Sequence, residues 1–220
     1  SVTQGTTYLG SPYDDTPGLK TGDNATLTVE FSEPVDSFSS ANITPHPYVI
    51  LAEMSPNDNN TIWTGTFTPT FPNTEDWTNT LRLEAASYTD VDNNTGTAVT
   101  SPNYMIDDIY PSTKSAPTLT LSSPLLLHDQ DAELTLVFPE PVTSVLPNTL
   151  VASFSSADDI NLDNATGSLS TMSPNDNKTT WTGTFTPTTD MEVDNNTITL
   201  DASWTDQVGN PGTSVTTSNF

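Results

Sequence analysis

Short stretches of alternating apolar and polar residues recur along the chain, each set between clusters of turn-forming residues. Residues 26–31 place Leu27, Val29 and Phe31 on one face of an extended strand, and residues 133–138 repeat the same pattern. Stretches with helical periodicity are almost missing. Because this alternation is typical of strands that bury one face, the sequence predicts an all-β protein built as a sandwich.

The chain contains two copies of one unit. Residues 54–70 (MSPNDNNTIWTGTFTPT) return at 172–188 with 15 of 17 positions identical. Trp63 and Phe67 alternate with threonines in the first copy, so we expect these rings and their counterparts to anchor two cores. The SPNDN that precedes each strand is rich in turn formers and is predicted to be a loop. A duplicated block means that one supersecondary unit was built twice.

Further matches extend the repeat over most of both copies. FSEPV at 31–35 corresponds to FPEPV at 138–142, and YTDVDNNTG at 88–96 corresponds to WTDQVGNPG at 204–212. The offset between matches changes, so insertions separate them, and insertions normally fall in surface loops.

One predicted strand differs in length between the copies. Residues 79–90 contain one residue more than their counterpart at 196–206. A slip of one residue turns every following side chain to the other face of a strand, which would point Tyr88 away from the core. We therefore predict a β-bulge near Ala85 and Ala86.

These matches predict two tandem immunoglobulin-like β-sandwich domains. The first covers residues 1–106, with residues 1–10 as an N-terminal arm, and the second covers residues 118–220. The linker, residues 107–117, is short, acidic and proline-containing, so it is predicted to be semi-rigid and to join the domains into a rod. Each domain, of roughly 110 residues, is large enough to bury its own core.

The amino-acid composition argues against several classes of binding partner. The chain has 28 acidic residues against 4 basic ones and a net charge of −24, with no cysteine. A chain without a basic patch is a poor ligand for nucleic acid or for an anionic membrane surface. Without a run of 18 apolar residues, no membrane insertion is predicted. Because such a charge makes the folded protein repel itself, divalent cations become the first ligand to consider.

The motifs FSEPV and FPEPV, WTGTFTPT and TDQVGNPG together resemble the bacterial immunoglobulin-like (Big) tandem repeats of large surface adhesins. The resemblance covers most of both copies. It implies a sandwich of about seven strands, an exported protein at the cell surface or outside the cell, a spacer or adhesive role without catalysis, and calcium held at loops and domain junctions.

Acidic and amide side chains near the linker are the predicted calcium ligands. The set comprises Asp90, Asp92 and Asn94 in one loop with Asp107 and Asp108 at the linker. Asp206 and Asn210 are their counterparts and are predicted to form a half-site at the far end of the chain. Calcium takes six to eight oxygen ligands from such groups and tolerates irregular geometry. The alternative is that these residues form ordinary solvated turns.

No combination of residues predicts catalysis. The two histidines, His46 and His128, do not occupy equivalent positions, and each is expected in a surface loop. Neighbouring acidic residues such as Asp14 and Asp15 do not face each other as a glycosidase pair must. Glu33 and its counterpart Glu140 are either ligands or residues that shape a strand end.

We therefore predict a non-enzymatic extracellular structural module: tandem repeats that form a rod-like, cation-stiffened segment of a surface fibre or adhesin. Its partners would be neighbouring Ig-like repeats or copies of itself, arranged end to end, and a surface or glycan target. One alternative is a self-assembling, pilus-like filament subunit that adds its N-terminal strand to the next molecule. Another is a glycan-binding module with exposed aromatic residues.

Overall fold

The computed structural model of this chain is almost entirely β. It describes residues 18–44, 48–70, 72–127, 130–142, 158–189 and 193–220. The predicted N-terminal arm, His46 and His128 lie outside these ranges. The chain divides into two compact units, Ser1–Asp108 and Ile109–Phe220, each described here by itself. Within the described ranges, no helix is long and apolar enough to cross a membrane.

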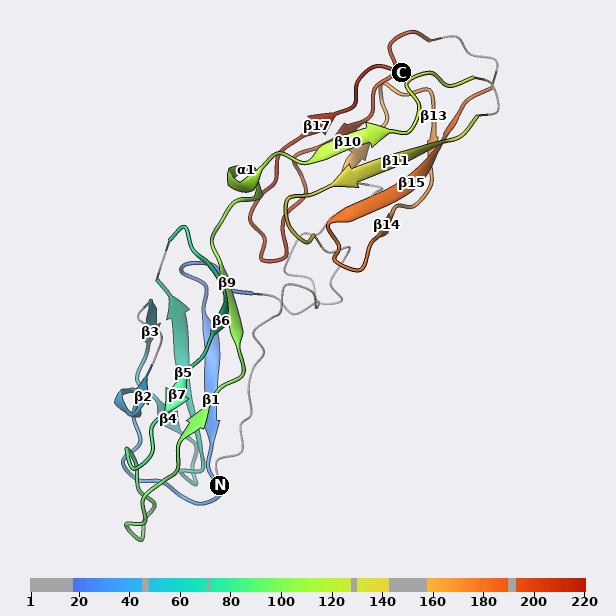
Figure 1. The fold of residues 1–220 in the computed structure, drawn as a ribbon. Coiled ribbons are helices and arrows are strands. Elements are labelled where there is room, and N and C mark those ends of the chain that lie inside the picture. The colour runs from blue at the N-terminus through green and yellow to red at the C-terminus, as the bar shows by residue number, and fades with distance from the viewer. Residues whose placement is uncertain (1–17, 45–47, 71, 128–129, 143–157, 190–192) are drawn as a thin grey trace. The chain divides into compact units, whose positions relative to one another are not determined.

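Unit 1 is built from antiparallel strands in three groups (Figure 1). The first sheet has the order β1 (Ala25–Glu30), β5 (Ile62–Pro69), β3 (Val49–Leu51), and β4 (Ser55–Pro56) also pairs with β5. The second has the order β2 (Ile43–Thr44), β7 (Arg82–Leu83), β8 (Val99–Thr100). The third group is the pair β6 (Glu75–Asn79) and β9 (Tyr104–Asp107). A single turn of 3-10 helix, Ser40–Asn42, precedes β2.

Unit 2 repeats this plan with two sheets. A short helix, α1 (Pro111–Lys114), leads into it. The first sheet has the order β10 (Thr118–Leu121), β11 (Ala132–Val137), β15 (Thr180–Pro187), β13 (Gly167–Leu169), with β14 (Ser173–Pro174) also on β15. The second has the order β12 (Ile160–Asn161), β16 (Thr199–Leu200), β17 (Val215–Thr216).

The duplicated aromatic strand forms the centre of each core, as predicted. Val29 of β1 lies opposite Trp63 of β5, and Leu136 of β11 lies opposite Trp181 of β15. Both indole rings are buried, and so are Phe67 and its counterpart. Replacing either Trp with Ala would cost about 3–5 kcal/mol of folding stability, because a large buried ring would be lost. The β-sandwich prediction is confirmed.

The predicted turn before the aromatic strand is also confirmed, although Ser55 and Pro56 of SPNDN belong to strand β4. The side-chain oxygen of Asn57 accepts hydrogen bonds from the backbone N–H groups of Thr61 and Ile62, at 3.0 and 3.1 Å. Asn60 closes the turn with a left-handed φ of 53°. A side-chain amide that satisfies two backbone donors is a typical way to fix such a turn.

The predicted bulge near Ala85 and Ala86 is wrong. Strand β7 already ends at Leu83, and the extra residue is absorbed in a turn where Ala86 takes a φ of 57°. The turn then returns Tyr88 to the core, where it is buried. A turn outside the ladder accommodates one more residue without shifting the register of any strand pair.

Candidate functional site

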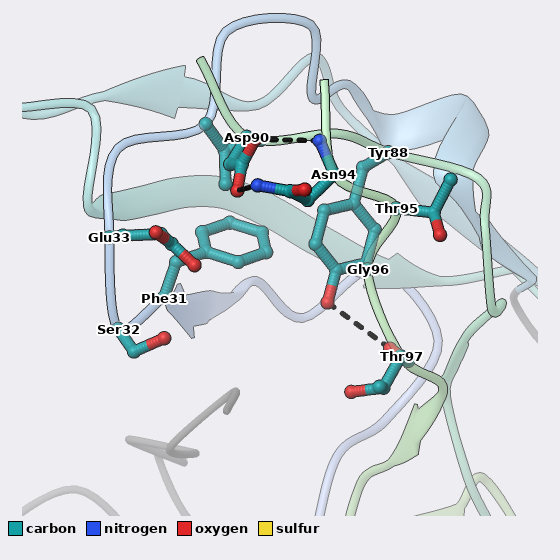
Figure 2. Close-up of a pocket in the computed structure, with 10 residues that line it drawn as sticks. Phe31, Ser32, Glu33, Tyr88, Asp90, Asn94, Thr95, Gly96 and Thr97 are labelled. Carbon is teal, nitrogen blue, oxygen red and sulfur yellow. Dashed lines mark hydrogen bonds between the residues drawn. The ribbon is translucent and has the colours of Figure 1, made fainter. Parts of the chain in front are cut away.

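The Asp90 turn, residues 90–94, lies at the end of unit 1 where β1 leads into Phe31–Val35. Asp90 Oδ1 accepts hydrogen bonds from the backbone N–H groups of Asp92 and Asn94, at 2.9 and 2.8 Å. Its Oδ2 accepts a third, from Asn94 Nδ2 at 2.8 Å (Figure 2). Three of the predicted calcium ligands are thus close together. The carboxylate of Asp90 is already satisfied by its own turn, which is the usual role of an Asx residue.

A cavity of about 120 Å³ opens beside this turn. Its lining includes Phe31, Glu33 and Tyr88 together with Asp90 and Asn94 (Figure 2). Tyr88 donates a hydrogen bond from its hydroxyl to the Thr97 carbonyl at 3.1 Å. Glu33 is exposed and contributes a carboxylate to the lining. The lining of the cavity therefore combines aromatic rings with acidic and amide groups.

The Asp206 turn, residues 206–210, reproduces the same geometry in unit 2. Asp206 Oδ1 accepts from the N–H groups of Val208 and Asn210 at 3.0 and 2.8 Å, and Oδ2 accepts from Asn210 Nδ2 at 2.8 Å. Asn210 Nδ2 also donates to the Ile109 carbonyl at 3.3 Å. The predicted half-site is therefore not at the far end of the chain, because it lies beside the first residue of unit 2.

Lys114 gives unit 2 a cation that the sequence reasoning missed. Its ammonium group donates to Glu140 Oε2 at 2.7 Å, and the side chains of Lys114 and Glu140 are 23% and 5% exposed. Glu140 is the counterpart of Glu33. In unit 2 this glutamate position pairs with the Lys114 ammonium group, whereas in unit 1 it lines the cavity beside the Asp90 turn. The chain has only four basic residues among 28 acidic ones, so each basic residue is a candidate partner for a buried carboxylate.

The two turn aspartates differ in electrostatics. Hydrogen bonds from Asn94, the side-chain bond first, lower the pKa of Asp90 below its ordinary value of 3.8. Burial raises the pKa of Asp206 above that value, and the bonds from Asn210 only partly offset the effect. Residues Asp90 and Asp206 are 9% and 1% exposed, and taking a carboxylate out of water disfavours its charged form.

A pair of acidic residues, Glu75 and Asp107, lies in unit 1 at the C-terminal end of β9. Asp107 is directly opposite Glu75 of β6, and their carboxylate oxygens lie within 4.8 Å of each other. Asp107 is buried, whereas Glu75 is exposed. Like charges directly opposite each other on neighbouring strands repel, so a cation bound between the two carboxylates would stabilise this pair.

Asp108 follows immediately and ties two loops together. Its Oδ2 accepts from the Asn73 N–H at 3.0 Å and its Oδ1 accepts from the Thr21 N–H at 3.3 Å. Both bonds leave lone pairs on the carboxylate, because each oxygen offers about two acceptor positions.

The five ligands predicted for one calcium site separate into two groups at opposite ends of unit 1. Asp90 bridges to Val35, whose N–H bonds to the Asn60 carbonyl beside the start of β5. Asp107 bonds through its N–H to Leu19, near the far end of that strand. The eight residues of β5 lie between these ends, and the seven steps between them, at ~3.3 Å each, span ~23 Å.

Comparison with known proteins gives one family. A model described as a bacterial Ig-like domain matches residues 14–106 and again residues 113–220. The two matches together cover most of the chain and coincide with the two repeats. No curated protein matches the chain.

Proposed function

The chain belongs to the bacterial Ig-like domain family as a tandem of two such domains, and from this we propose that it is a structural segment of an extracellular fibre or adhesin, stiffened by calcium. Domains of this family are typically non-catalytic parts of surface proteins. The residues shared by both repeats support a structural role, because they build cores and turns. Trp63, Phe67 and Asn57 serve packing and turn formation in the same way as their counterparts.

The observation that carries the calcium proposal is the carboxylate pair Glu75 and Asp107. Asp107 is buried and lies directly opposite Glu75 on the neighbouring strand, and Asp108 follows Asp107 in the sequence. Calcium binds such clustered hard oxygens and would relieve the repulsion between them. Because Asp108 also fixes two loops of unit 1 through Asn73 and Thr21, an ion here would stiffen the C-terminal end of the unit.

Thermal unfolding of the whole chain in calcium and in chelator tests this proposal. A calcium concentration about 100-fold above Kd adds about 2.7 kcal/mol of stability, which would raise the melting temperature of unit 1 by about 10–15 °C. Glu75→Gln and Asp107→Asn should each abolish the calcium-dependent shift, while Asp58→Asn, in an exposed turn, should keep it. Magnesium should give a smaller shift, because it requires tighter octahedral geometry. Identical melting curves in calcium and in chelator would refute calcium binding at this pair.

Self-assembly by strand addition is the second candidate. Its donor would be residues 1–10, which lie outside the described residues. Electron microscopy of the purified chain would distinguish the two, because a filament subunit forms fibres and a spacer does not.

A further inference from the structure

One Asn-X-Thr triplet, the acceptor sequence for N-linked sugars, is present at the same position in both repeats. Such triplets occur seven times in the chain, at Asn24, Asn42, Asn59, Asn93, Asn164, Asn177 and Asn195. A chain this rich in Asn and Thr produces them by composition, so the motif alone selects no residue. Asn59 and Asn177 hold equivalent positions. The other five have no equivalent triplet in the other copy, where for example Gly209 stands at the position of Asn93.

The two duplicated segments differ without losing this triplet. They differ at two of their 17 positions: Asn60 corresponds to Lys178, and Ile62 corresponds to Thr180. The first difference falls on the middle residue of the triplet, which the motif leaves free, and the second lies outside the triplet. Asn-Asn-Thr in unit 1 and Asn-Lys-Thr in unit 2 are therefore both acceptor sequences.

The structure places Asn59 at the corner of a turn whose backbone is tied to the core. The N–H of Asn60 donates to the Asn57 carbonyl at 3.0 Å, which closes a four-residue turn with Asn59 at its third position. The Asn60 carbonyl accepts the indole N–H of the buried Trp63 at 3.2 Å. Because the next residue is held against the core, Asn59 lies on the outside of the turn, where it is exposed.

Asn177 has the same setting in unit 2. The N–H of Lys178 donates to the Asn175 carbonyl at 3.0 Å, and the Lys178 carbonyl accepts the Trp181 indole N–H at 3.2 Å. Asn177 is exposed as well. The side chains of Asn59 and Asn177 form no hydrogen bond with the described part of the chain. Their Nδ2 atoms are therefore accessible to an enzyme in the folded protein.

Asn42 shows the opposite case, a triplet whose asparagine already serves the fold. It is half-buried, its Nδ2 donates to the Ser87 carbonyl, and its Oδ1 accepts the Ser39 N–H at 2.7 Å. A sugar on this nitrogen would disturb the contact that joins two loops of unit 1. At Asn59 and Asn177 no such contact with a described residue stands in the way.

We propose that Asn59 and Asn177 are N-glycosylation sites, one in each repeat. The asparagine Nδ2 attacks C1 of a sugar whose C1 oxygen is esterified to a phosphate or pyrophosphate. The N–C1 bond forms, the C1–O bond breaks, the phosphate ester leaves with the bonding electron pair, and the amide gives one proton to a base of the transferase. A bulky, solvated sugar suits a turn tip outside the core. This inference rests on the proposed extracellular location and not on calcium.

Peptide mapping by mass spectrometry tests this proposal on the whole chain, purified from the surface of its source organism. Cleavage after methionine and aromatic residues gives peptides that span residues 55–63 and 173–181. Both peptides should carry the added mass of one or more sugars. Electron-transfer fragmentation should place that mass on Asn59 and Asn177.

Three variants made in the same organism separate the acceptor from its surroundings. Asn59→Gln keeps an amide but removes the acceptor, and Thr61→Ala removes the hydroxyl group that the motif requires. Both variants should lose the added mass from residues 55–63. Asn60→Lys is the matched control: it creates the triplet of unit 2 and should keep the added mass.

An unmodified mass for either peptide would overturn the proposal, and so would an added mass that persists in Asn59→Gln. Modification of Asn42 without Asn59 would also overturn it, because accessibility would then not select the site. An unmodified chain at the cell surface refutes this inference alone. Recovery of the chain only from the cytoplasm would refute the extracellular location together with it.

Discussion

Asp90 and Asp206 accept the same three hydrogen bonds in the two repeats, yet their pKa values move in opposite directions. The hydrogen-bond geometry is duplicated, while the burial around it is not. Asn210 is buried and contacts the Ile109 carbonyl, whereas Asn94 is exposed. The direction of the pKa shift of the turn aspartate therefore depends on the burial around the turn and not on the hydrogen bonds within it.

The first prediction concerns pH. Because the folded pKa of Asp90 lies below 3.8, its contribution to stability is present above pH 3.8 and is lost as pH falls through the lowered folded value. For Asp206 the folded unit keeps its proton longer than the unfolded chain does. Its effect is therefore a loss of stability as pH rises from 3.8 through the raised folded value.

Unfolding of the wild type, Asp90→Asn and Asp206→Asn across about pH 3–7 measures both effects. The stability difference between wild type and Asp90→Asn should shrink toward acid. The difference between wild type and Asp206→Asn should move in favour of the wild type toward acid. Parallel pH profiles for the two variants would contradict the assignment of opposite shifts.

The second prediction concerns the pair Lys114 and Glu140. Lys114→Met should destabilise unit 2 by about 2–3 kcal/mol, because it leaves a buried carboxylate without its ammonium partner. The matched control is Arg82→Gln, which breaks an exposed pair with Glu84 in unit 1 and should cost at most about 1 kcal/mol. The double variant Lys114→Met, Glu140→Met should regain most of the loss. An equal cost for the two single variants would show that burial does not matter.

The third prediction concerns close packing of glycine under an aromatic ring. A Cβ on Gly212 would lie 2.0 Å from the Trp204 ring, so Gly212→Ala must displace a fully buried side chain. We expect a loss of about 1–3 kcal/mol in unfolding free energy, as for overpacked cores. Thr213→Ala is the control: its backbone carbonyl still accepts the Trp204 Nε1 hydrogen bond, so its stability should stay close to that of the wild type.

Local patterns predicted the fold well because each depends on neighbouring residues. The alternation around Trp63 fixes which face is buried, and Asn57 with Asn60 fixes the turn before it. The extra residue near Ala86 was misassigned to a bulge, because the sequence does not say where a hydrogen-bond ladder stops. Strand β7 ends at Leu83, and a turn takes up the difference.

The candidate site was harder to predict because its geometry depends on strand direction and register. Asp90 and Asp107 are only 17 positions apart in sequence, but the chain between them passes through β8 and β9 and crosses the unit. Glu75 was missed for a related reason. It joins Asp107 only through the β6–β9 register, which contains an irregularity between Asp76 and Asn79.

The last prediction uses one of the two differences between the duplicated segments. Asn60 and Lys178 hold the same position in the turn, and both have a left-handed φ, 53° and 54°. Asparagine tolerates this conformation better than lysine does. Lys178→Asn should therefore stabilise unit 2 by about 0.5–1 kcal/mol, and Asn60→Lys should destabilise unit 1 by a similar amount. Chemical denaturation of both variants measures the two changes. If backbone strain governs this turn, the signs must be opposite, and a loss of stability in both variants would assign the effect to side-chain contacts instead.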